Sequence, residues 1–255
     1  MRVALSIAGF DPSGGAGVLA DMRAFASFGV YGMAVVTAIT AQNSTGVHMA
    51  HPLSRLHILH QLEDIFSDFT VSAVKIGMLR SRTAALTVAR FLRTCEGQPP
   101  IVLDPVLVSS SGRLLLDPVA LRAVKHELLH QCSLVTPNLR EASVLSGRPV
   151  ETVEDMERAA MVIRQYGPGA VLVKGGHLKS AATDVFFDGD RFLRLKGKRS
   201  RLDVHGTGCH LSAAIAAHLA VGMPMDKSVE SAKVFMEKMF ARRTFKPGAG
   251  MHYFY

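Results

Sequence analysis

The chain has 255 residues, of which 48% are hydrophobic, and this is enough for one large α/β domain with a sizeable core. No run of about 18 apolar residues occurs without interruption, so the sequence predicts no membrane span. The formal net charge is +8, but Trp is absent and Tyr is scarce, so the aromatic platforms on which nucleic-acid bases stack are few. We therefore predict no nucleic-acid partner, and a basic protein that handles small anionic phosphates fits better.

The first residues of the chain and the spacing of its cysteines indicate the cellular compartment in which the protein is expected. The first apolar run, Val3–Ala8, is too short for the core of a signal peptide and leads directly into a glycine-rich loop. The three cysteines, Cys95, Cys132 and Cys209, have neither the spacing of a zinc pair nor that of a redox motif. A chain with no targeting segment and unpaired thiols is typical of a reducing compartment, so we expect a cytoplasmic protein.

Strand-like and helix-like segments alternate along the chain, beginning with a buried strand at Val3–Ala8 and a helix at Val18–Phe28. Further strands are predicted at Met33–Thr40, Ala73–Ile76, Ile101–Asp104, Leu134–Thr136 and Ala170–Lys174. Further helices are predicted at Leu53–Phe69, Arg82–Arg93, Pro118–Gln131, Val153–Tyr166, Gly208–Val221 and Ser228–Arg242. An Asp-Gly turn predicts a hairpin between the strands Thr183–Phe187 and Arg191–Leu195.

This alternation predicts βαβ units, and hence a mostly parallel central sheet with helices on both faces. Ligands of such folds bind beyond the carboxyl ends of the strands. The segments that follow the predicted strands are rich in glycine and polar residues, which makes this edge of the sheet the expected site. Because the sequence contains no repeat or linker, we predict one domain over residues 1–255.

The sequence His205-Gly206-Thr207-Gly208-Cys209 stands at the start of a predicted helix. Glycines allow backbone N–H groups to turn inwards, and the helix dipole adds positive charge, so this turn is a candidate anion site for a transferring phosphoryl group. Cys209 lies in the first turn of the helix, a position that predicts a lowered thiol pKa. The alternative is an ordinary glycine turn followed by a buried, inert cysteine.

The loop Gly9–Gly17 is the second candidate site. Its end matches the G-x-G-x-x-A form of a dinucleotide fingerprint, but the following strand has no carboxylate for a ribose. Asp11 and Asp21 flank the glycines and would repel a pyrophosphate. We therefore expect this loop to contact a neutral, polar acceptor substrate; the alternative is a plain strand-to-helix turn.

The sequence His126-Glu127-Leu128-Leu129-His130 matches the zinc-protease motif, with Glu151 where a third ligand would stand. At 100° per residue, however, both histidines point away from the apolar seam of the predicted helix. A solvated helix face is the preferred interpretation, and a zinc hydrolase is kept as a distant alternative. No G-x-x-x-x-G-K-[ST] loop occurs, so a bound nucleotide would need a different architecture.

Taken in order, seven segments closely resemble the hydroxymethylpyrimidine/phosphomethylpyrimidine kinases of thiamine biosynthesis, within the ribokinase-like superfamily. The resemblance runs from Val3 to about Lys238, and its segments are Ala8–Asp21, Thr37–Asn43, Lys75–Leu79, Asp104–Val106, Thr136–Ala142, Val171–His177 and His205–Cys209. It implies a three-layer α/β sandwich. It also implies transfer of the γ-phosphate of ATP, with Mg²⁺, first to a hydroxymethylpyrimidine and then to its monophosphate.

The resemblance also implies roles for single residues. Cys209 matches the catalytic position, and Gly206 and Gly208 match the anion hole around the phosphoryl group. The acceptor pocket is expected to comprise Gln42, Asp21, Met78 and Gly9. The nucleotide and metal side is expected to comprise Asn138, Glu141, Asp104, Lys174, Thr207 and Lys233, with Lys174 also counted as catalytic and Glu141 as the metal residue.

Some residues depart from the family pattern. The loop Val108–Gly112 has no lysine, although the family commonly has one there, and this puts the second phosphorylation in question. Asp203-Val204 stands where the family has asparagine-threonine, and Lys246–Gly250 replaces a histidine-containing tail. These changes concern the substrate and the second step rather than the fold.

Two functional alternatives remain. A kinase of pyridoxine, pyridoxal or pyridoxamine has a related acceptor with the same hydroxymethyl group, and Gln42 favours the pyrimidine because its amide can pair with an aminopyrimidine edge. A pyrimidine-binding protein without turnover is the other alternative. The resemblance further implies a homodimer.

Overall fold

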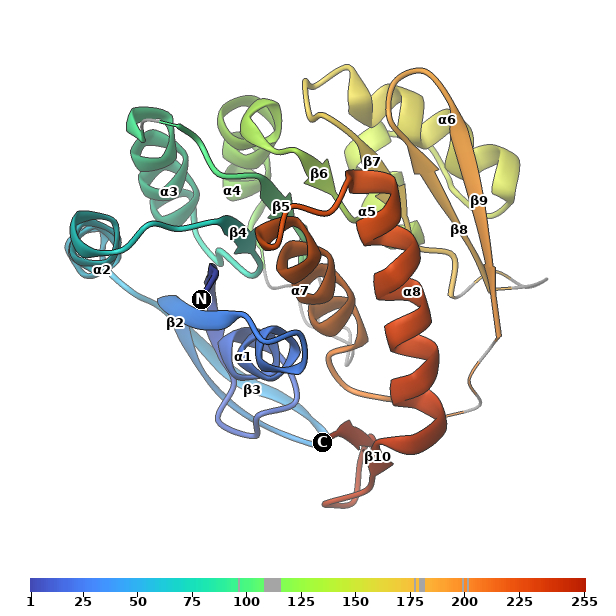
Figure 1. Ribbon diagram of the computed structural model, residues 1–255, viewed down its shortest axis with the longest axis horizontal. Helices are drawn as coiled ribbons and strands as arrows, with labels where there is room; N and C mark the ends of the chain where they lie inside the picture. Colours follow the sequence, from blue (N-terminus) through green and yellow to red (C-terminus); the bar gives the residue numbers. More distant parts are fainter. Residues whose placement is uncertain (96, 108–115, 177, 179–181, 199, 201) are drawn as a thin grey trace.

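The computed structural model describes residues 1–95, 97–107, 116–176, 178, 182–198, 200 and 202–255. Within these residues a nine-stranded sheet has the order β3-β2-β1-β4-β5-β6-β7-β8-β9 (Figure 1). Its strands are β1 (Val3–Phe10), β2 (Tyr31–Asn43), β3 (Gly46–Pro52), β4 (Ala73–Ile76), β5 (Ile101–Leu103), β6 (Leu134–Val135), β7 (Val171–Val173), β8 (Ala182–Phe187) and β9 (Phe192–Gly197). The pairings from β2 to β7 are parallel, whereas β3, β8 and β9 join antiparallel at the two ends of the sheet.

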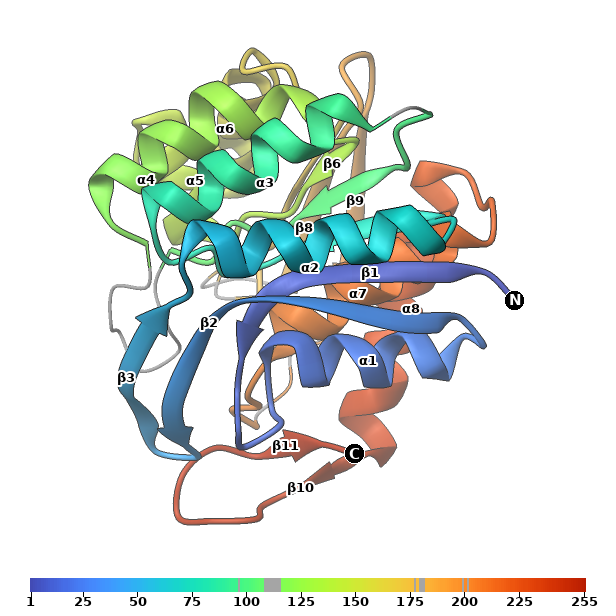
Figure 2. The ribbon, with the colours of Figure 1, turned by 90° about the vertical axis from the view of Figure 1, so that its left-hand side faces the viewer.

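Helices cover both faces of the sheet, which makes the three-layer sandwich that the sequence predicts (Figure 2). One layer contains α2 (Arg55–Asp68), α3 (Arg82–Thr94), α4 (Pro118–Ala123), α5 (Leu139–Ser146) and α6 (Val153–Arg164). The other contains α1 (Gly17–Ser27), α7 (Thr207–Ala220) and α8 (Met225–Arg242). In the described ranges, no helix has the length and apolarity that a membrane crossing requires.

Alternate side chains of each central strand pack against the two helix layers. In β1, Leu5 and Ile7 join the apolar cluster under α2–α6, whereas Ala4 joins the cluster under α7. Both faces of such a strand are buried, which explains its continuous apolar run. The alanine-rich middle of α7, including Ala213 and Ala217, is fully buried, so small side chains let this helix lie close to the sheet. This close approach places the first turn of α7 at the carboxyl ends of the strands.

The structure corrects three details of the predicted elements. Gly46–Pro52 forms β3, which the sequence did not predict because its apolar residues are interrupted by His48 and His51. Leu139–Ser146 forms α5, an eight-residue helix too short to show a clear period, but one that has a capping box. The helix predicted over Pro118–Gln131 is α-helical only to Ala123. The rest of this segment is a π-helical turn over Val124–Leu128 and a 3₁₀ turn over Leu129–Gln131.

Candidate active site

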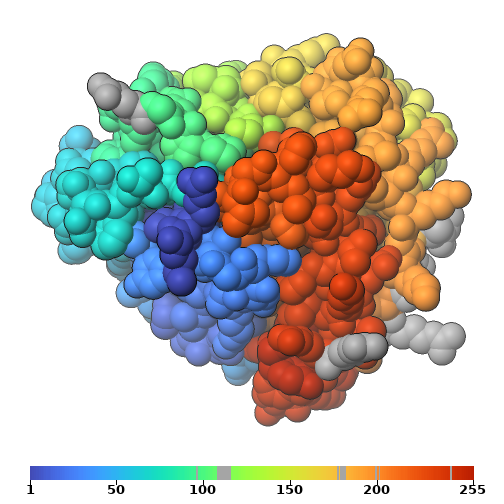
Figure 3. All heavy atoms as spheres, in the orientation of Figure 1, coloured from blue at the N-terminus to red at the C-terminus, as the bar shows by residue number. Residues whose placement is uncertain are grey.

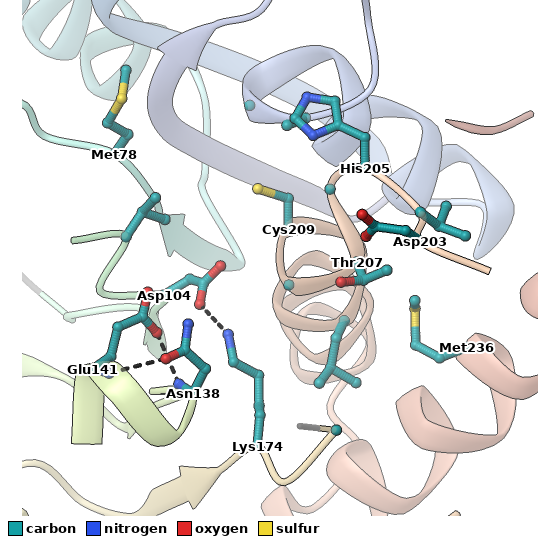
Figure 4. Close-up of a pocket in the computed structure, with 18 of the residues that line it drawn as sticks. Met78, Asp104, Asn138, Glu141, Lys174, Asp203, His205, Thr207, Cys209 and Met236 are labelled. Carbon is teal, nitrogen blue, oxygen red and sulfur yellow. Dashed lines mark hydrogen bonds and ion pairs between the residues drawn. The ribbon is translucent and has the colours of Figure 1, made fainter. Parts of the chain in front are cut away.

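A cavity of about 1150 Å³ lies at the carboxyl ends of the parallel strands, where the loops after several strands meet the first turn of α7 (Figure 4). This is the edge at which the topology predicts a ligand. Twelve of the thirteen predicted site residues line it: Gly9, Gln42, Met78, Asp104, Asn138, Glu141, Lys174, Gly206, Thr207, Gly208, Cys209 and Lys233. The fold therefore brings together residues that are up to 224 positions apart (Lys233 minus Gly9).

Gly9 and Met78 lie at one wall of the cavity, which we call the acceptor side because the sequence analysis predicts the acceptor pocket there. A Cβ atom at Gly9 would overlap the terminal methyl group of Met78, so glycine is needed for this methionine to lie where it does. The Thr37 hydroxyl donates to the Met78 carbonyl at 2.6 Å and holds the backbone behind it. A flexible thioether against a backbone without a side chain makes an apolar wall suited to a flat ring.

Asp21, the remaining predicted residue, does not line the cavity, so its assignment to the acceptor pocket stays a prediction. Its side chain is fully buried on α1, where it pairs with Lys75 at 2.8 Å and accepts a hydrogen bond from the Ser6 hydroxyl at 2.5 Å. The α1 register decides this, because Asp21 falls on the face that packs against β1 and β4. Asp21 is thus the partner of Lys75, whose side chain reaches the cavity lining.

Asp11 and His205 form a buried pair on the acceptor side that the sequence did not predict. Asp11 Oδ2 lies 3.0 Å from His205 Nε2, and the Gln42 amide nitrogen lies 3.5 Å from the same ring nitrogen. Burial raises the pKa of Asp11, but hydrogen bonds from His205, Ser13 and Gln42 lower it to about 2. An ionised carboxylate accepts only, so His205 donates from Nε2. The signal in the sequence was an aspartate directly after a buried strand and before three glycines within six residues, Gly14, Gly15 and Gly17.

Cys209 lies third in α7, beside the ammonium group of Lys75, as the helix boundary predicts. Its expected low pKa is wrong. Burial raises the pKa of Cys209 to about 11, although Lys75 and the Gly17 amide act in the opposite direction. Loss of solvent around the thiolate outweighs the positive end of the helix, because the helix dipole carries only about half a charge.

The turn at the start of α7 has the backbone that an anion site requires. Gly206 is the N-cap with φ of 75° and ψ of 18°, a left-handed conformation that favours glycine, and a Cβ there would overlap the Gly15 carbonyl. A Cβ at Gly208 would stand 3.1 Å from Lys174 Nζ and 3.2 Å from Asp104 Oδ2. The first residues of α7 thus line the cavity beside the Lys174–Asp104 ion pair, and Thr207 lies between the two glycines.

The side of the cavity opposite Gly9 and Met78 carries charged groups. Lys174 pairs with Asp104 at 2.6 Å, and Thr136 donates to the same carboxylate oxygen at 3.2 Å. Asn138 caps α5 by accepting from the Glu141 amide at 2.9 Å, while the Glu141 carboxylate accepts from the Asn138 amide at 2.8 Å. Burial raises the pKa of Glu141 to about 7. The carboxylate oxygens of Glu141 and of the neighbouring Asp104 are the hard donors that a divalent cation prefers.

Lys233 of α8 reaches the same side from a distant part of the sequence. Its ammonium group pairs with Asp184 of β8, and the second oxygen of Asp184 accepts from the Gly175 amide at 2.8 Å. Lys174 and Lys233 remain 15% and 17% exposed, so each is held by a carboxylate but open to the cavity. Two such cations can meet the phosphates of a nucleotide.

The zinc-protease motif lies outside this cavity. His126 and His130 are exposed, and Glu127 pairs with Arg93 at 3.0 Å on the surface. Among the described residues, no group of three or more His, Cys, Asp or Glu side chains is arranged to hold a metal ion. The solvated-face interpretation therefore holds for this segment.

The fold and the cavity together define a ribokinase-like kinase. The family model described as phosphomethylpyrimidine kinase matches residues 11–254, and the chain belongs to this family. A hydroxymethylpyrimidine/phosphomethylpyrimidine kinase of Rhizobium meliloti is 48% identical over 237 residues, which cover 92% of this chain and 88% of the relative.

Solved structures give the same family and a related one. Phosphomethylpyrimidine kinase of Clostridium difficile 630 superposes with a TM-score of 0.83 at 38% identity, covering 93% of this chain and 99% of that one. An ADP complex of Bacillus subtilis pyridoxal kinase superposes with a TM-score of 0.91 at 33% identity, covering 100% and 96%. The chain is thus a phosphotransferase of this family, and its choice of acceptor is a question for the cavity.

Proposed function

We propose that this chain transfers the γ-phosphate of ATP to 4-amino-5-hydroxymethyl-2-methylpyrimidine, and then to the resulting monophosphate, for thiamine biosynthesis. The observation that carries the proposal is the first turn of α7. It stands between an acceptor side of neutral and hydrogen-bonded groups and a side with two partly open lysines. The names of the relatives described above support the same pair of reactions.

The acceptor hydroxyl would lie against Cys209, with the ring between Met78 and Gln42. A bond forms between the hydroxyl oxygen and the γ-phosphorus, and the bond from that phosphorus to the β–γ bridging oxygen breaks. Because the transition state is loose, the hydroxyl proton leaves late and can pass to an oxygen of the transferred phosphoryl group. A strong base is therefore not needed, which suits a thiol with a pKa of about 11. The Gly208 amide, at the start of α7, stabilises the charge of the phosphoryl oxygens.

ATP and Mg²⁺ are proposed on the residues of the charged side. Lys174 and Lys233 would meet the phosphates of ATP, and Thr207 and Asp104 lie along the same wall. Glu141 and Asn138 would organise Mg²⁺, because the oxygens of their capping box are the hard donors this ion prefers. Bound Mg²⁺ supplies charge neutralisation to the phosphates. The residues Val108–Gly112, whose missing lysine bears on the second step, lie outside the described residues.

A pyridoxal kinase is the second candidate, and the Bacillus subtilis structure is the observation that favours it. Both acceptors are flat rings with a hydroxymethyl group, so the cavity can accommodate either. Gln42 favours the pyrimidine, because a side-chain amide pairs with an amino group and the neighbouring ring nitrogen. A binding protein without turnover is disfavoured because Cys209, Asn138 and Glu141 all stand in the cavity.

The test is an incubation of purified protein with ATP and Mg²⁺, in which the hydroxymethylpyrimidine, its monophosphate and pyridoxal are offered separately. ADP release and product mass are followed. We expect turnover of both pyrimidines. Turnover of the alcohol alone would indicate a one-step kinase, and a preference for pyridoxal would move the function to vitamin B6 salvage. No turnover of any acceptor would contradict the proposal and favour a binding protein.

Three expectations about the whole protein stay proposals. We infer one domain over residues 1–255, a cytoplasmic location and a homodimer. The family match over residues 11–254 supports the first, and the free thiols of all three cysteines support the second. The exposed side chains of Ile39 and Met49, on the β2 and β3 edge, are apolar surface that a dimer would bury. Light scattering of the purified chain tests the third.

A further inference from the structure

The last six residues, Gly250–Tyr255, form a segment that we call the C-terminal strap. It begins beside the turn between β2 and β3, and contains β11 (Tyr253–Phe254), which pairs with β10 (Thr244–Phe245) (Figure 2). In the space-filling view the red C-terminal part of the chain lies directly against the blue N-terminal part (Figure 3). Tyr253 and Phe254 are 4% and 2% exposed, so the strap is packed into the molecule.

Backbone hydrogen bonds tie the strap to two segments of the acceptor side. The Met251 amide donates to the Ser44 carbonyl at 2.9 Å, and the Gly250 amide donates to the Ser44 hydroxyl at 3.2 Å, two residues beyond Gln42. The His252 amide donates to the Asp203 carbonyl at 2.9 Å, and the His205 amide donates to the His252 carbonyl at 2.8 Å. The strap thus joins the end of β2 to the segment that leads into α7.

A chain of side-chain hydrogen bonds ties the strap to a third segment, the glycine-rich loop. The Tyr253 hydroxyl donates to Ser13 Oγ at 2.8 Å, and the Ser13 hydroxyl donates to Asp11 Oδ1 at 2.7 Å. The other oxygen of Asp11 accepts from His205 at 3.0 Å. A Cβ at Gly15 would overlap the rings of both His205 and Tyr253, so this loop lies between them.

We propose that Tyr253 is a positioning residue that sets the affinity for the acceptor substrate. The strap meets three segments, and each carries a residue of the acceptor side, namely Asp11, Gln42 or His205. The Tyr253 hydroxyl orients the Ser13 hydroxyl, which joins the backbone amides of Ser13 and Ala16 in holding the Asp11 carboxylate. This carboxylate in turn orients His205, which lies 3.5 Å from the Gln42 amide nitrogen. The chain's own carboxyl-terminal residues therefore complete the acceptor half of the site. This inference rests on the proposed phosphotransfer to a hydroxymethyl acceptor.

Tyr253→Phe removes the hydroxyl and keeps the ring. We expect the KM for the hydroxymethylpyrimidine to rise about fivefold, the range that loss of one hydrogen bond produces, with the KM for ATP unchanged. Tyr31→Phe is the matched control, because Tyr31 is 55% exposed and begins β2 at the end opposite Gln42. A role in folding alone would lower the active fraction, and so the apparent kcat, without separating the two KM values.

Ser13→Ala breaks the same chain one residue further along and does not disturb the strap. We expect the same rise in the acceptor KM, and a double variant with Tyr253→Phe no worse than the more affected single variant, because both changes remove one path. An unchanged acceptor KM in both single variants, or equal rises in the two KM values, would overturn the inference. If the unaltered protein phosphorylates none of the three acceptors, the proposed function fails instead.

Discussion

The two sides of the cavity keep their charges in different ways. On the acceptor side, Lys75 and Asp21 pair with each other and are both 0% exposed, although Lys75 belongs to the cavity lining and Asp21 does not. On the nucleotide side, Lys174 and Lys233 pair with carboxylates but remain partly exposed. The fully buried pair of Lys75 and Asp21 cannot exchange partners without exposing a charge. The partly exposed ammonium groups of Lys174 and Lys233 can instead turn from their carboxylates to a bound phosphate. We therefore expect the loss of a fully buried partner to affect mainly stability, and the loss of a partly exposed lysine to affect mainly turnover.

Of the variants that test this difference between the two sides, Lys75→Met has the largest expected effect. It leaves the Asp21 carboxylate buried and unpaired, so we expect the free energy of unfolding to fall by about 3–5 kcal/mol. Urea unfolding measures this, with Lys233→Met as the control at the partly exposed pair, where a smaller loss is expected. The double change Lys75→Met with Asp21→Asn should recover part of the loss. An unfolding free energy like that of the unaltered protein would show that the buried pair contributes nothing.

Lys174→Met removes a cation on the nucleotide side. Under the proposed function we expect kcat to fall about a thousandfold, because a positioned charge near the phosphoryl group is lost. The unfolding free energy should also fall, because Asp104 is buried and loses its partner, but by less than in Lys75→Met, because the Lys174 side chain is 15% exposed. Lys196→Met, an exposed change on β9, is the control for loss of a lysine from the surface. Steady-state kinetics with saturating ATP measure the effect. A fall in stability as large as that of Lys75→Met would remove the distinction between the two sides.

Cys209→Ala tests the residue that stands between the two sides. We expect turnover to fall about a hundredfold and nucleotide binding to persist, because the proposed function places the thiol against the acceptor hydroxyl rather than against ATP. Calorimetric titration with ADP separates the two quantities, and Cys95→Ala, at the end of α3, is the control. Turnover close to that of the unaltered protein would exclude Cys209 from the mechanism.

The pH dependence of thiol alkylation sharpens the same point. Because burial raises the pKa of Cys209 to about 11, its thiolate is scarce at pH 7 and becomes more abundant as the pH rises towards that value. We expect its rate of reaction with iodoacetamide to rise about tenfold per pH unit between pH 7 and pH 10. Peptide mass spectrometry assigns the modified cysteine. A plateau near pH 8.5, the ordinary value of a thiol, would contradict the raised pKa.

Gly9→Ala has the smallest expected effect, and only on the acceptor side. The new methyl group would displace the end of the Met78 side chain, so we expect the acceptor KM to rise about fivefold and the KM for ATP to stay the same. Adding Met78→Ala should reverse part of the rise, because the space is then free. Kinetics of the two variants with both substrates decide this. A change in the KM for ATP instead would place Gly9 on the other side.

Local sequence carried enough information for most of the architecture and for much of the site. Buried apolar runs marked the parallel strands, and the glycines before Cys209 marked the start of α7, because these patterns reflect backbone geometry and burial on both faces. The order of the segments also placed their polar ends at one edge of the sheet. A short strand with histidines, β3, and a short helix, α5, were missed because neither shows a period long enough to recognise.

The tertiary structure alone decided what each charge does. Asp21 and Asp11 both flank glycines in the sequence, yet one is sealed with Lys75 and the other orients His205 beside the cavity. The pKa of Cys209 likewise depends on how much solvent the fold removes, which outweighs its position in the helix. The sequence by itself determined the elements and the edge where they meet. Burial and long-range partners, which follow only from packing, determined the pKa values and the contact between Tyr253 and Ser13.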